Sequence, residues 1–259
     1  MSACPNHPIG ETQETRSTLF SPRNGQDSPA IPKPAANFDR LAHLYRWMEY
    51  ASFGPWLWKC RCAFFADLLA CRRALVLGDG DGRFTARLLA ANPQIEVDAV
   101  DASAAMLRSL ERRAAPHRVR LRAERADVRM GDAQAWNTPH APYDLVATHF
   151  FLDCLTTEEV RALAHRVRPA AAGGARWVVS EFAVPAGPFG RFVARPIVAL
   201  LYAAFGLMTG LEVRTLSDHS AALRSSGFVL EKKRTWLGGL LVSEIWRADP
   251  RSPVSAPRA

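Results

Sequence analysis

The stretch that decides the fold reads Ala74-Leu-Val-Leu-Gly78-Asp-Gly80-Asp-Gly82-Arg-Phe84. Its apolar start predicts a buried strand, its glycines predict a tight turn, and the apolar spacing that follows predicts a helix. Glycine tolerates positive φ angles and allows a ligand to approach the backbone closely. The stretch therefore predicts a strand–turn–helix unit that binds a ligand at its turn.

The glycine spacing and the acidic residues of this turn argue against a dinucleotide. A dinucleotide-binding loop would place its third glycine where Arg83 stands. Asp79 and Asp81 would also repel a pyrophosphate at the start of the helix. The two carboxylates suit a ligand that carries an ammonium and a sulfonium. A nicotinamide-dependent oxidoreductase is therefore a minor alternative.

Short apolar runs alternate with helical patterns along the rest of the chain. Further strands are predicted at Ile95–Val100, Val128–Met130, Tyr143–Thr148 and Trp177–Phe182, with helices from Ser103 and Thr157. Such alternation predicts an α/β fold, in which a parallel sheet carries helices on both faces. The last two runs, Phe228–Lys232 and Leu240–Arg247, are joined by Gly238-Gly239 and predict a hairpin.

The proline-rich ends bound a single folded domain. We expect residues 1–36 and 249–259 to be disordered tails and residues 37–248 to form the domain. Two helices are predicted within 37–70, and a helical lid over a substrate pocket is predicted within 186–212. The uncharged run Pro196–Leu211 has 16 residues, fewer than the roughly 18–20 that span a bilayer. Contact with a membrane surface stays an alternative for this helix.

Charge and cysteine content give weaker constraints. The formal net charge is +8, and arginines gather between residues 108 and 129. We interpret this cluster as a solvated face, with a basic patch for an anionic partner as the alternative. The five cysteines form an odd set without disulfide spacing, so a reducing cytoplasm is the expected location. Cys60 and Cys62 lack the spacing of a zinc site, and no metal is expected.

A second carboxylate stands where such folds bind a ribose. Asp101 ends the predicted strand Val97-Asp-Ala-Val-Asp101, about 20 residues beyond the glycine turn. The same position holds the ribose hydroxyls of nucleotide ligands in open α/β sheets. Asp101 is therefore predicted to bind a ribose, and Ser103 is predicted to cap the next helix.

These motifs, taken in order, resemble the class I S-adenosylmethionine-dependent methyltransferase family over about residues 38–247. The resemblance rests on Gly78–Gly82, Val100–Leu107, Gly131-Asp132-Ala133, Tyr143–Phe151 and Trp177–Phe182. It implies a Rossmann-like sheet of seven strands in the order 3-2-1-4-5-7-6, mostly parallel, with the last strand antiparallel. It also implies S-adenosylmethionine as the cofactor. The entry helices are loosely similar to those of quinone-biosynthesis methyltransferases.

The resemblance implies a set of cofactor-binding residues. Asp132 would accept a hydrogen bond from the adenine amine, and Phe150 could line the adenine, face the sulfonium or simply pack in the core. At Asp79 the family more often has Cys, Ala or Glu, but an acid there is compatible with the cofactor. The full implied set is Gly78, Asp79, Gly80, Gly82, Asp101, Ala102, Asp132, Ala133 and Phe150.

Methyl transfer requires in-line approach of a nucleophile in a dry pocket, and a base is optional. His149 follows the fourth predicted strand, where ligands bind in open α/β sheets. It is the candidate catalytic base, with a structural hydrogen bond at the strand end as the alternative. Asp153 and Glu181 are further carboxylates near strand ends that could contact a substrate.

The acceptor is only partly constrained by the sequence. The fourth strand ends in Thr-His-Phe-Phe, without the Asn/Asp-Pro-Pro-aromatic motif of amino-directed nucleic-acid methyltransferases, and the chain has no Pro-Cys pair. A small-molecule acceptor is favoured, and the apolar segment Phe189–Leu211 suggests that it could be lipophilic. A nucleic-acid methyltransferase and a catalytically inactive cofactor-binding regulator stay as alternatives.

Overall fold

The computed structural model describes residues 53–129, 138–209 and 216–250, with the side chains of 204–209 left aside. All of them belong to one compact unit, Ala36–Ala259. The two predicted tails lie outside the described residues, except that residues 249 and 250 are described at the end of the last strand. The first of the two predicted entry helices also lies outside them.

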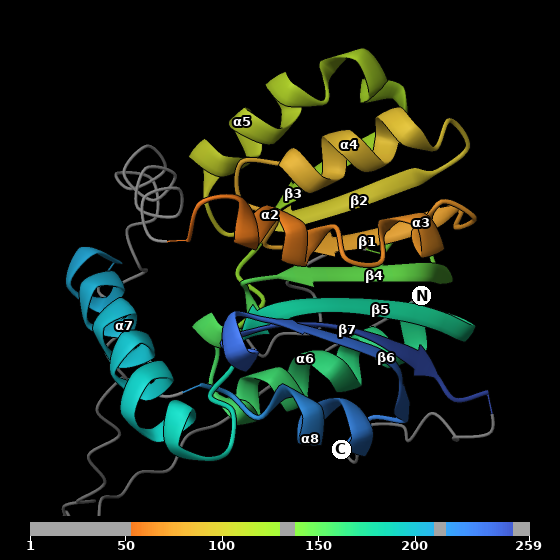
Figure 1. Cartoon of the computed structure of the whole chain (residues 1–259). Helices are drawn as coiled ribbons and strands as arrows, with labels where there is room; N and C mark the ends of the chain where they lie inside the picture. The colour runs from red at the N-terminus through yellow and green to blue at the C-terminus, as the bar shows by residue number, and fades with distance from the viewer. Residues whose placement is uncertain (1–52, 130–137, 210–215, 251–259) are drawn as a thin grey trace, which may run out of the picture. The chain divides into compact units, whose positions relative to one another are not determined.

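Seven strands form one sheet in the order β3-β2-β1-β4-β5-β7-β6, as the resemblance implied (Figure 1). Strands β1 to β5 pair in parallel, and β7 runs antiparallel to both β5 and β6. The strands are β1 Arg73–Leu77, β2 Glu96–Asp101, β3 Leu121–Arg125, β4 Tyr143–His149, β5 Ala171–Phe182, β6 Phe228–Trp236 and β7 Leu241–Ala248. The Rossmann-like prediction is therefore confirmed.

Helices cover both faces of this sheet because the strands alternate their side chains between two apolar clusters. Leu75 and Leu77 of β1 pack in the cluster that includes α6 and α8, whereas Ala74 and Val76 pack in the cluster that includes α3 and α4. The α-helices are α2 Pro55–Arg61, α3 Phe65–Leu68, α4 Arg83–Ala91, α5 Ala104–Arg113, α6 Thr157–Ala170, α7 Arg195–Thr209 and α8 His219–Ser225. Shorter helical turns are η2 Ala115–Arg120, η3 Leu152–Cys154, η4 Gly190–Ala194 and η5 Leu237–Gly239.

The predicted third strand was wrong in its position. The apolar run Val128–Met130 was expected to form it, but the strand that pairs with β2 is Leu121–Arg125. This strand lies at the edge of the sheet, and its residues are half-buried or exposed. An edge strand needs no continuous apolar run, because its backbone pairs on one side only. Hydrophobic pattern therefore failed to detect it.

Several arginines of the predicted solvated face make specific bonds instead. Arg120 donates to the backbone oxygens of Leu89, Asn92 and Ile95 at 2.8–3.1 Å. Arg113 donates to the Asp81 carboxylate at 2.9 Å. A guanidinium has five donors in a fixed fork, so it can satisfy several carbonyls at once. Part of the cluster thus holds α4, α5 and the edge of the sheet together.

The segment that was predicted to be a lid, 186–212, contains η4 and α7, and its role as a lid stays a prediction. Figure 1 shows α7 beyond the carboxyl ends of β4 and β5, where both strands point. Among the described residues, no helix is long and apolar enough to cross a membrane. The same residues contain no group of three or more His, Cys, Asp and Glu side chains that could hold a metal.

A capping box starts α6 and should be measurable in stability. Thr156 Oγ1 accepts from the Glu159 backbone N–H at 3.2 Å, and Glu159 Oε2 accepts from the Thr156 N–H at 2.7 Å. Thr156→Ala should lower the free energy of unfolding in urea by about 1 kcal/mol, because one helix donor loses its partner. Thr156→Ser keeps the oxygen and should match the wild type. Equal losses in both variants would contradict this explanation.

Candidate cofactor and substrate site

The glycine loop, residues 78–82, follows β1 directly and owes its shape to three positive φ angles. Gly78, Gly80 and Gly82 have φ of 65°, 62° and 77°. A Cβ on Gly78 would lie 2.1 Å from the Phe151 ring, and one on Gly82 would lie 2.6 Å from Leu110. At Gly80 the nearest atom would be the Met106 sulfur at 3.9 Å. Two glycines therefore allow close packing, and the third leaves the loop open to a ligand.

Asp79 lies buried in this loop with half of its carboxylate unused. Its Oδ2 accepts from the Thr85 N–H at 2.8 Å. Its Oδ1 is buried and has no hydrogen-bond partner among the described residues. Burial raises the pKa of Asp79 from 3.8 to about 6, although the Thr85 N–H opposes this shift. An unpartnered buried carboxylate oxygen is a ready acceptor for a ligand cation.

Asp81 has a different role from the one that its position in the loop suggested. Its carboxylate pairs with Arg83 and Arg113, each at 2.9 Å. These two guanidinium groups neutralise the charge that was expected to face a cationic ligand. Asp79, by contrast, has a buried carboxylate oxygen without a hydrogen-bond partner among the described residues.

Asp101 and Ala102 lie beside the glycine loop because β1 and β2 pair in parallel. Leu77 pairs with Val100, and the Gly78 N–H donates to the Val100 carbonyl at 2.9 Å. Asp101 Oδ1 accepts from the Ser103 N–H at 2.8 Å, and Ser103 caps α5 as predicted. Asp101 and Ala102 line a small cavity, here called the Asp101 cavity. Its other lining residues are Val100, Ala126, Asp127, Val128, Arg129, Phe151, Cys154 and Leu155.

Asp127 also lines the Asp101 cavity, although no sequence motif pointed to it. It follows β3 by two residues, and Phe151 lines the same cavity. A hydrogen bond from Arg129 lowers the pKa of its carboxyl, which stays ionised at neutral pH. The misplaced third strand hid this signal, because the acid after that strand was sought at Asp132. Asp132 and Ala133 lie outside the described residues.

His149 is the last residue of β4 rather than the residue after it, and it is enclosed. The side chain is 2% exposed, and its ring lies 4.3 Å from the ring of Phe84. Nδ1 is 3.0 Å from Ser180 Oγ, and Nε2 has no partner among the described residues. Burial, with a smaller effect of Arg61, lowers the pKa of His149 well below its usual range. Its catalytic role stays a prediction, for a ring that is neutral at physiological pH.

The two phenylalanines after β4 face different surroundings. Phe150 has a positive φ of 54°, and its ring lies 5.2 Å from the Phe182 ring in a cluster with Leu57 and Leu241. Phe151 lines the Asp101 cavity. Phe150 was predicted to contact the cofactor, whereas its neighbour Phe151 lines this cavity. Phe150 stays a prediction in that role.

Glu181 and Asp153 take part in hydrogen bonds that connect the loop after β4 with β5 and α7. Glu181 Oε1 accepts from the Phe151 and Leu152 N–H groups at 3.2 and 2.9 Å, and Oε2 has no partner among the described residues. Burial and then Asp153 raise the pKa of Glu181 well above its usual range. Burial also raises the pKa of Asp153 to about 6. The Tyr202 hydroxyl of α7 donates to the Asp153 carbonyl at 2.8 Å, which ties the lid to this loop.

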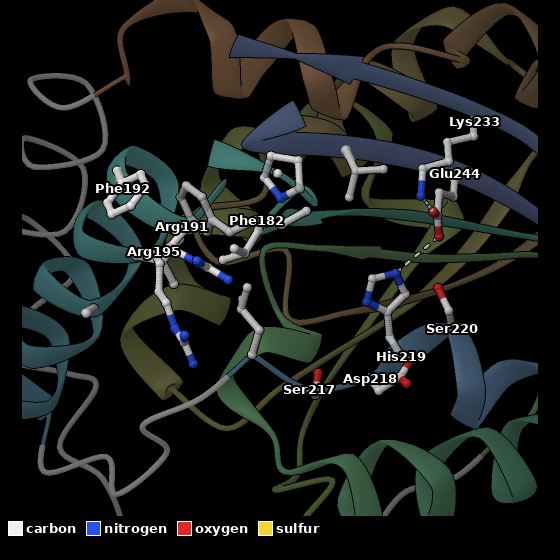
Figure 2. A pocket seen from close by; sticks show the side chains of 18 of the residues that line it. Phe182, Arg191, Phe192, Arg195, Ser217, Asp218, His219, Ser220, Lys233 and Glu244 are labelled. Carbon is white, nitrogen blue, oxygen red and sulfur yellow. Dashed lines mark hydrogen bonds and ion pairs between the residues drawn. The ribbon is translucent and has the colours of Figure 1, made fainter. Parts of the chain in front are cut away.

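A larger cavity of about 1070 Å³, here the α7 cavity, opens between α7, α8 and the ends of β5 and β7 (Figure 2). Its wall mixes apolar and charged side chains. Arg191 and Arg195 face it from the lid side, and His219, Lys233 and Glu244 face it from the sheet and α8. Phe182 lines the cavity and contacts Phe150. Pattern analysis predicted a lid but could not name these residues, because β6, β7 and α8 meet only in the fold.

Comparison with known proteins gives a family for this fold. Residues 74–174 match the model of a family described as a methyltransferase domain. No curated protein sequence matches significantly. Residues 74–174 thus match a methyltransferase domain, and the strand order is the one that the resemblance to class I methyltransferases implied. S-adenosylmethionine is the cofactor of this enzyme class.

Solved structures with the same fold are methyltransferases, at low sequence identity. A protein from Nostoc punctiforme PCC 73102, described as a putative O-methyltransferase, has a TM-score of 0.62 and 15% identity over 86% of this chain and 64% of its own. The mitomycin 7-O-methyltransferase MmcR has a TM-score of 0.58 and 16% identity over 82% of this chain and 60% of its own. PigF, solved with SAH (S-adenosylhomocysteine), has a TM-score of 0.57 and 18% identity over 81% and 61%. The chain thus spans less than two thirds of each of these structures.

The residues of the site fit this cofactor. The unpartnered Oδ1 of Asp79 can accept from an ammonium, and the open face of Gly80 leaves room at the backbone. The Asp101 cavity, about 40 Å³, is smaller than a purine ring, but its carboxylate and mostly apolar walls have the polarity that a ribose and a purine edge require. The donor set therefore agrees with S-adenosylmethionine in charge, in polarity and in the order of its parts.

The buried charge of Asp79 should show in the stability of the ligand-free methyltransferase. A raised pKa means that the folded chain binds this proton more tightly than the unfolded chain. The associated stability is present below about pH 4 and is lost as the pH rises through about 6. Asp79→Asn should therefore raise the free energy of unfolding by about 1–3 kcal/mol at pH 7, and by much less at pH 4.

Urea unfolding of both proteins at pH 4, 5.5 and 7 measures this difference. The same variant should bind S-adenosylmethionine more weakly, because the carboxylate charge is gone. Parallel stability profiles of wild type and Asp79→Asn across this pH range would show that the carboxyl is not held in a raised-pKa environment.

Proposed function

We propose that this methyltransferase moves the methyl group of S-adenosylmethionine to a small molecule bound in the α7 cavity. One observation carries the proposal: the Asp101 cavity, the glycine loop and the α7 cavity all lie at the carboxyl edge of one parallel sheet. Ligands bind at this edge in open α/β folds. Phe182 lines the α7 cavity, and its ring lies 5.2 Å from the ring of Phe150, which follows β4 at this edge.

The chain's own residues would act mainly by positioning. Asp79 would hold the ammonium of the cofactor and Asp101 its ribose, while Gly78, Gly80, Gly82 and Ala102 would give the backbone room. Asp127 and Phe151 support a purine in the Asp101 cavity. The bound cofactor supplies an electrophilic methyl group on a sulfonium. Alignment of an acceptor with that group in a water-poor cavity supplies much of the acceleration of such reactions.

The lining of the α7 cavity supports an acceptor that is partly apolar. Phe182, Val198 and Val242 alternate with polar residues in its wall. Phe192, which lines the cavity, and Leu200 of α7 are 70% and 71% exposed, so apolar surface of this segment is available to a ligand. MmcR, a structural neighbour, is a mitomycin 7-O-methyltransferase. A small and lipophilic acceptor is therefore our proposal, and membrane-surface contact of α7 and a cytoplasmic location stay predictions from the sequence.

The alternatives have less support in the described structure. The arginines proposed for a nucleic-acid partner include Arg113, Arg120 and Arg129, which bond to groups of the chain itself. Each such bond occupies guanidinium donors that a phosphate contact would need, and the carboxylate partners of Arg113 and Arg129 also neutralise their charge. A catalytically inactive regulator would keep the Asp101 cavity but would not need the large cavity beneath α7.

Calorimetric titration of S-adenosylmethionine and S-adenosylhomocysteine tests the cofactor site. We expect saturable binding by the wild type and at least about tenfold weaker binding by Asp101→Ala, because hydrogen bonds to a charged group contribute roughly 1.5–3 kcal/mol. Glu111→Ala removes an exposed carboxylate of α5 and should bind like the wild type. Absence of binding by folded wild-type protein would reject the proposed function. Equal affinities of the wild type and Asp101→Ala would reject the ribose role of Asp101.

A further inference from the structure

The wall of the α7 cavity contains a histidine that is hydrogen-bonded to a buried carboxylate. His219 Nε2 lies 3.1 Å from Glu244 Oε2, and Lys233 Nζ lies 2.8 Å from Glu244 Oε1. Glu244 also accepts from the Trp246 indole N–H at 2.9 Å. Its side chain is 1% exposed, so both carboxylate oxygens are buried and bonded. The sequence analysis singled out none of these four residues, which come from α8, β6 and β7.

Glu244 keeps its negative charge although it is buried. Burial by itself would raise the pKa of this carboxyl, but the hydrogen bonds and charges of His219 and Lys233 lower the pKa to about 2. The group is therefore an anion at every pH at which the protein would function. A fixed carboxylate beside an imidazole orients the ring and stabilises the imidazolium that forms when the ring accepts a proton.

The same contact sets which nitrogen of His219 is the proton acceptor. Because Glu244 Oε2 is an ionised acceptor, Nε2 carries the hydrogen of the neutral ring, and Nδ1 carries the lone pair. Figure 2 shows Nε2 joined to Glu244 and the other ring nitrogen facing the open part of the cavity. The His219 side chain is 12% exposed, so a ligand in the cavity can reach it.

We propose that His219 is the catalytic base of the methyl transfer, that Glu244 is its positioning residue, and that the acceptor bears an ionisable hydroxyl such as a phenol. This inference rests on the proposed function. His219 Nδ1 takes the hydroxyl proton while the acceptor oxygen attacks the methyl carbon of bound S-adenosylmethionine. The carbon–sulfur bond breaks, and its electron pair stays on sulfur. The products are the methyl ether, S-adenosylhomocysteine and the imidazolium, which returns its proton to water.

His219 meets a requirement of a general base that His149 does not. A base needs access to the substrate. His149 is enclosed between Phe84 and Ser180, and burial lowers its pKa. His219 faces the cavity and has a permanent carboxylate partner. On the opposite wall, Arg191 and Arg195 add positive charge that favours an acceptor in its ionised form (Figure 2).

The probe for this proposal is 4-nitrophenol, whose absorption reports whether its hydroxyl is ionised. It is titrated into the methyltransferase in complex with S-adenosylhomocysteine, and the pH is then varied. With wild type we expect saturable binding and ionisation of the bound probe at a lower pH than in solution. His219→Gln should weaken binding of the phenolate about tenfold and remove the shift, because a charge-assisted hydrogen bond is lost.

Matched controls separate a base from a structural residue. Glu244→Gln should reduce the shift in the same direction, whereas His165→Gln, an exposed residue of α6, should leave it unchanged. The methyl ether 4-nitroanisole has no proton to give, and its affinity should be the same for wild type and His219→Gln. In the wild-type complex, ¹⁵N NMR should show His219 protonated at Nε2 alone without 4-nitrophenol, and as imidazolium when 4-nitrophenol is bound.

The outcomes distinguish this inference from the proposed function. If S-adenosylhomocysteine does not bind to the folded protein, the proposed function fails, and the base assignment fails with it. If it binds but 4-nitrophenol does not, or if the shift survives in His219→Gln, only the base assignment is overturned. A His219 ring that stays neutral in the wild-type ternary complex overturns it as well, and this readout does not depend on the folding of any variant.

Discussion

Parallel pairing of β1 with β2 and β4 is the constraint on which the site depends. Leu77, the last residue of β1, pairs with Val100 on one side and Thr148 on the other. Because the three strands run in the same direction, their carboxyl ends stop at one edge. The glycine loop, Asp101 and the Phe150 turn therefore meet there, although up to about 70 residues separate them in the sequence. A shift in the register of either pair would separate them.

The glycine loop adds a local constraint to this arrangement. Positive φ angles at Gly78 and Gly82 let the Phe151 ring and α5 approach closely, and a side chain at either position would collide with them. The same turn buries Asp79, whose ionised form is disfavoured without a cation. Stability and ligand binding thus oppose each other at one residue, which is common at functional sites.

Buried acids fall into two groups that differ in what surrounds them. Glu244 has three donors and stays ionised, so it can orient another residue. Glu181 and Asp79 each keep one oxygen without a partner among the described residues, and their pKa values are raised. Ionisation of a buried acid is favourable only where donors or positive charges compensate for the lost water. The first group suits a permanent charge, and the second suits contact with a ligand.

Local sequence by itself determined the strand–turn–helix unit around Gly78–Gly82, the carboxylate at the end of β2 and the cap at Ser103. These features depend on backbone conformation and hydrogen bonds within a few residues, which the residue types dictate directly. The resemblance of the ordered motifs to a known family also predicted the order of the strands in the sheet. The edge strand β3 was misplaced, since pairing on one side requires no apolar run, and Asp127 was missed with it.

Tertiary structure alone decided the partners of the charged residues. Asp81 bonds to Arg113, which lies 32 positions away, and His219 meets Glu244 across 25 positions. Neither pair leaves a local sequence pattern. The glycine loop and α5, like α8 and β7, come together only when the chain folds. The fold also enclosed His149 and left His219 open to the α7 cavity. Sequence position places a residue at the edge of the sheet, whereas packing of neighbouring elements determines its charge, its exposure and its partner.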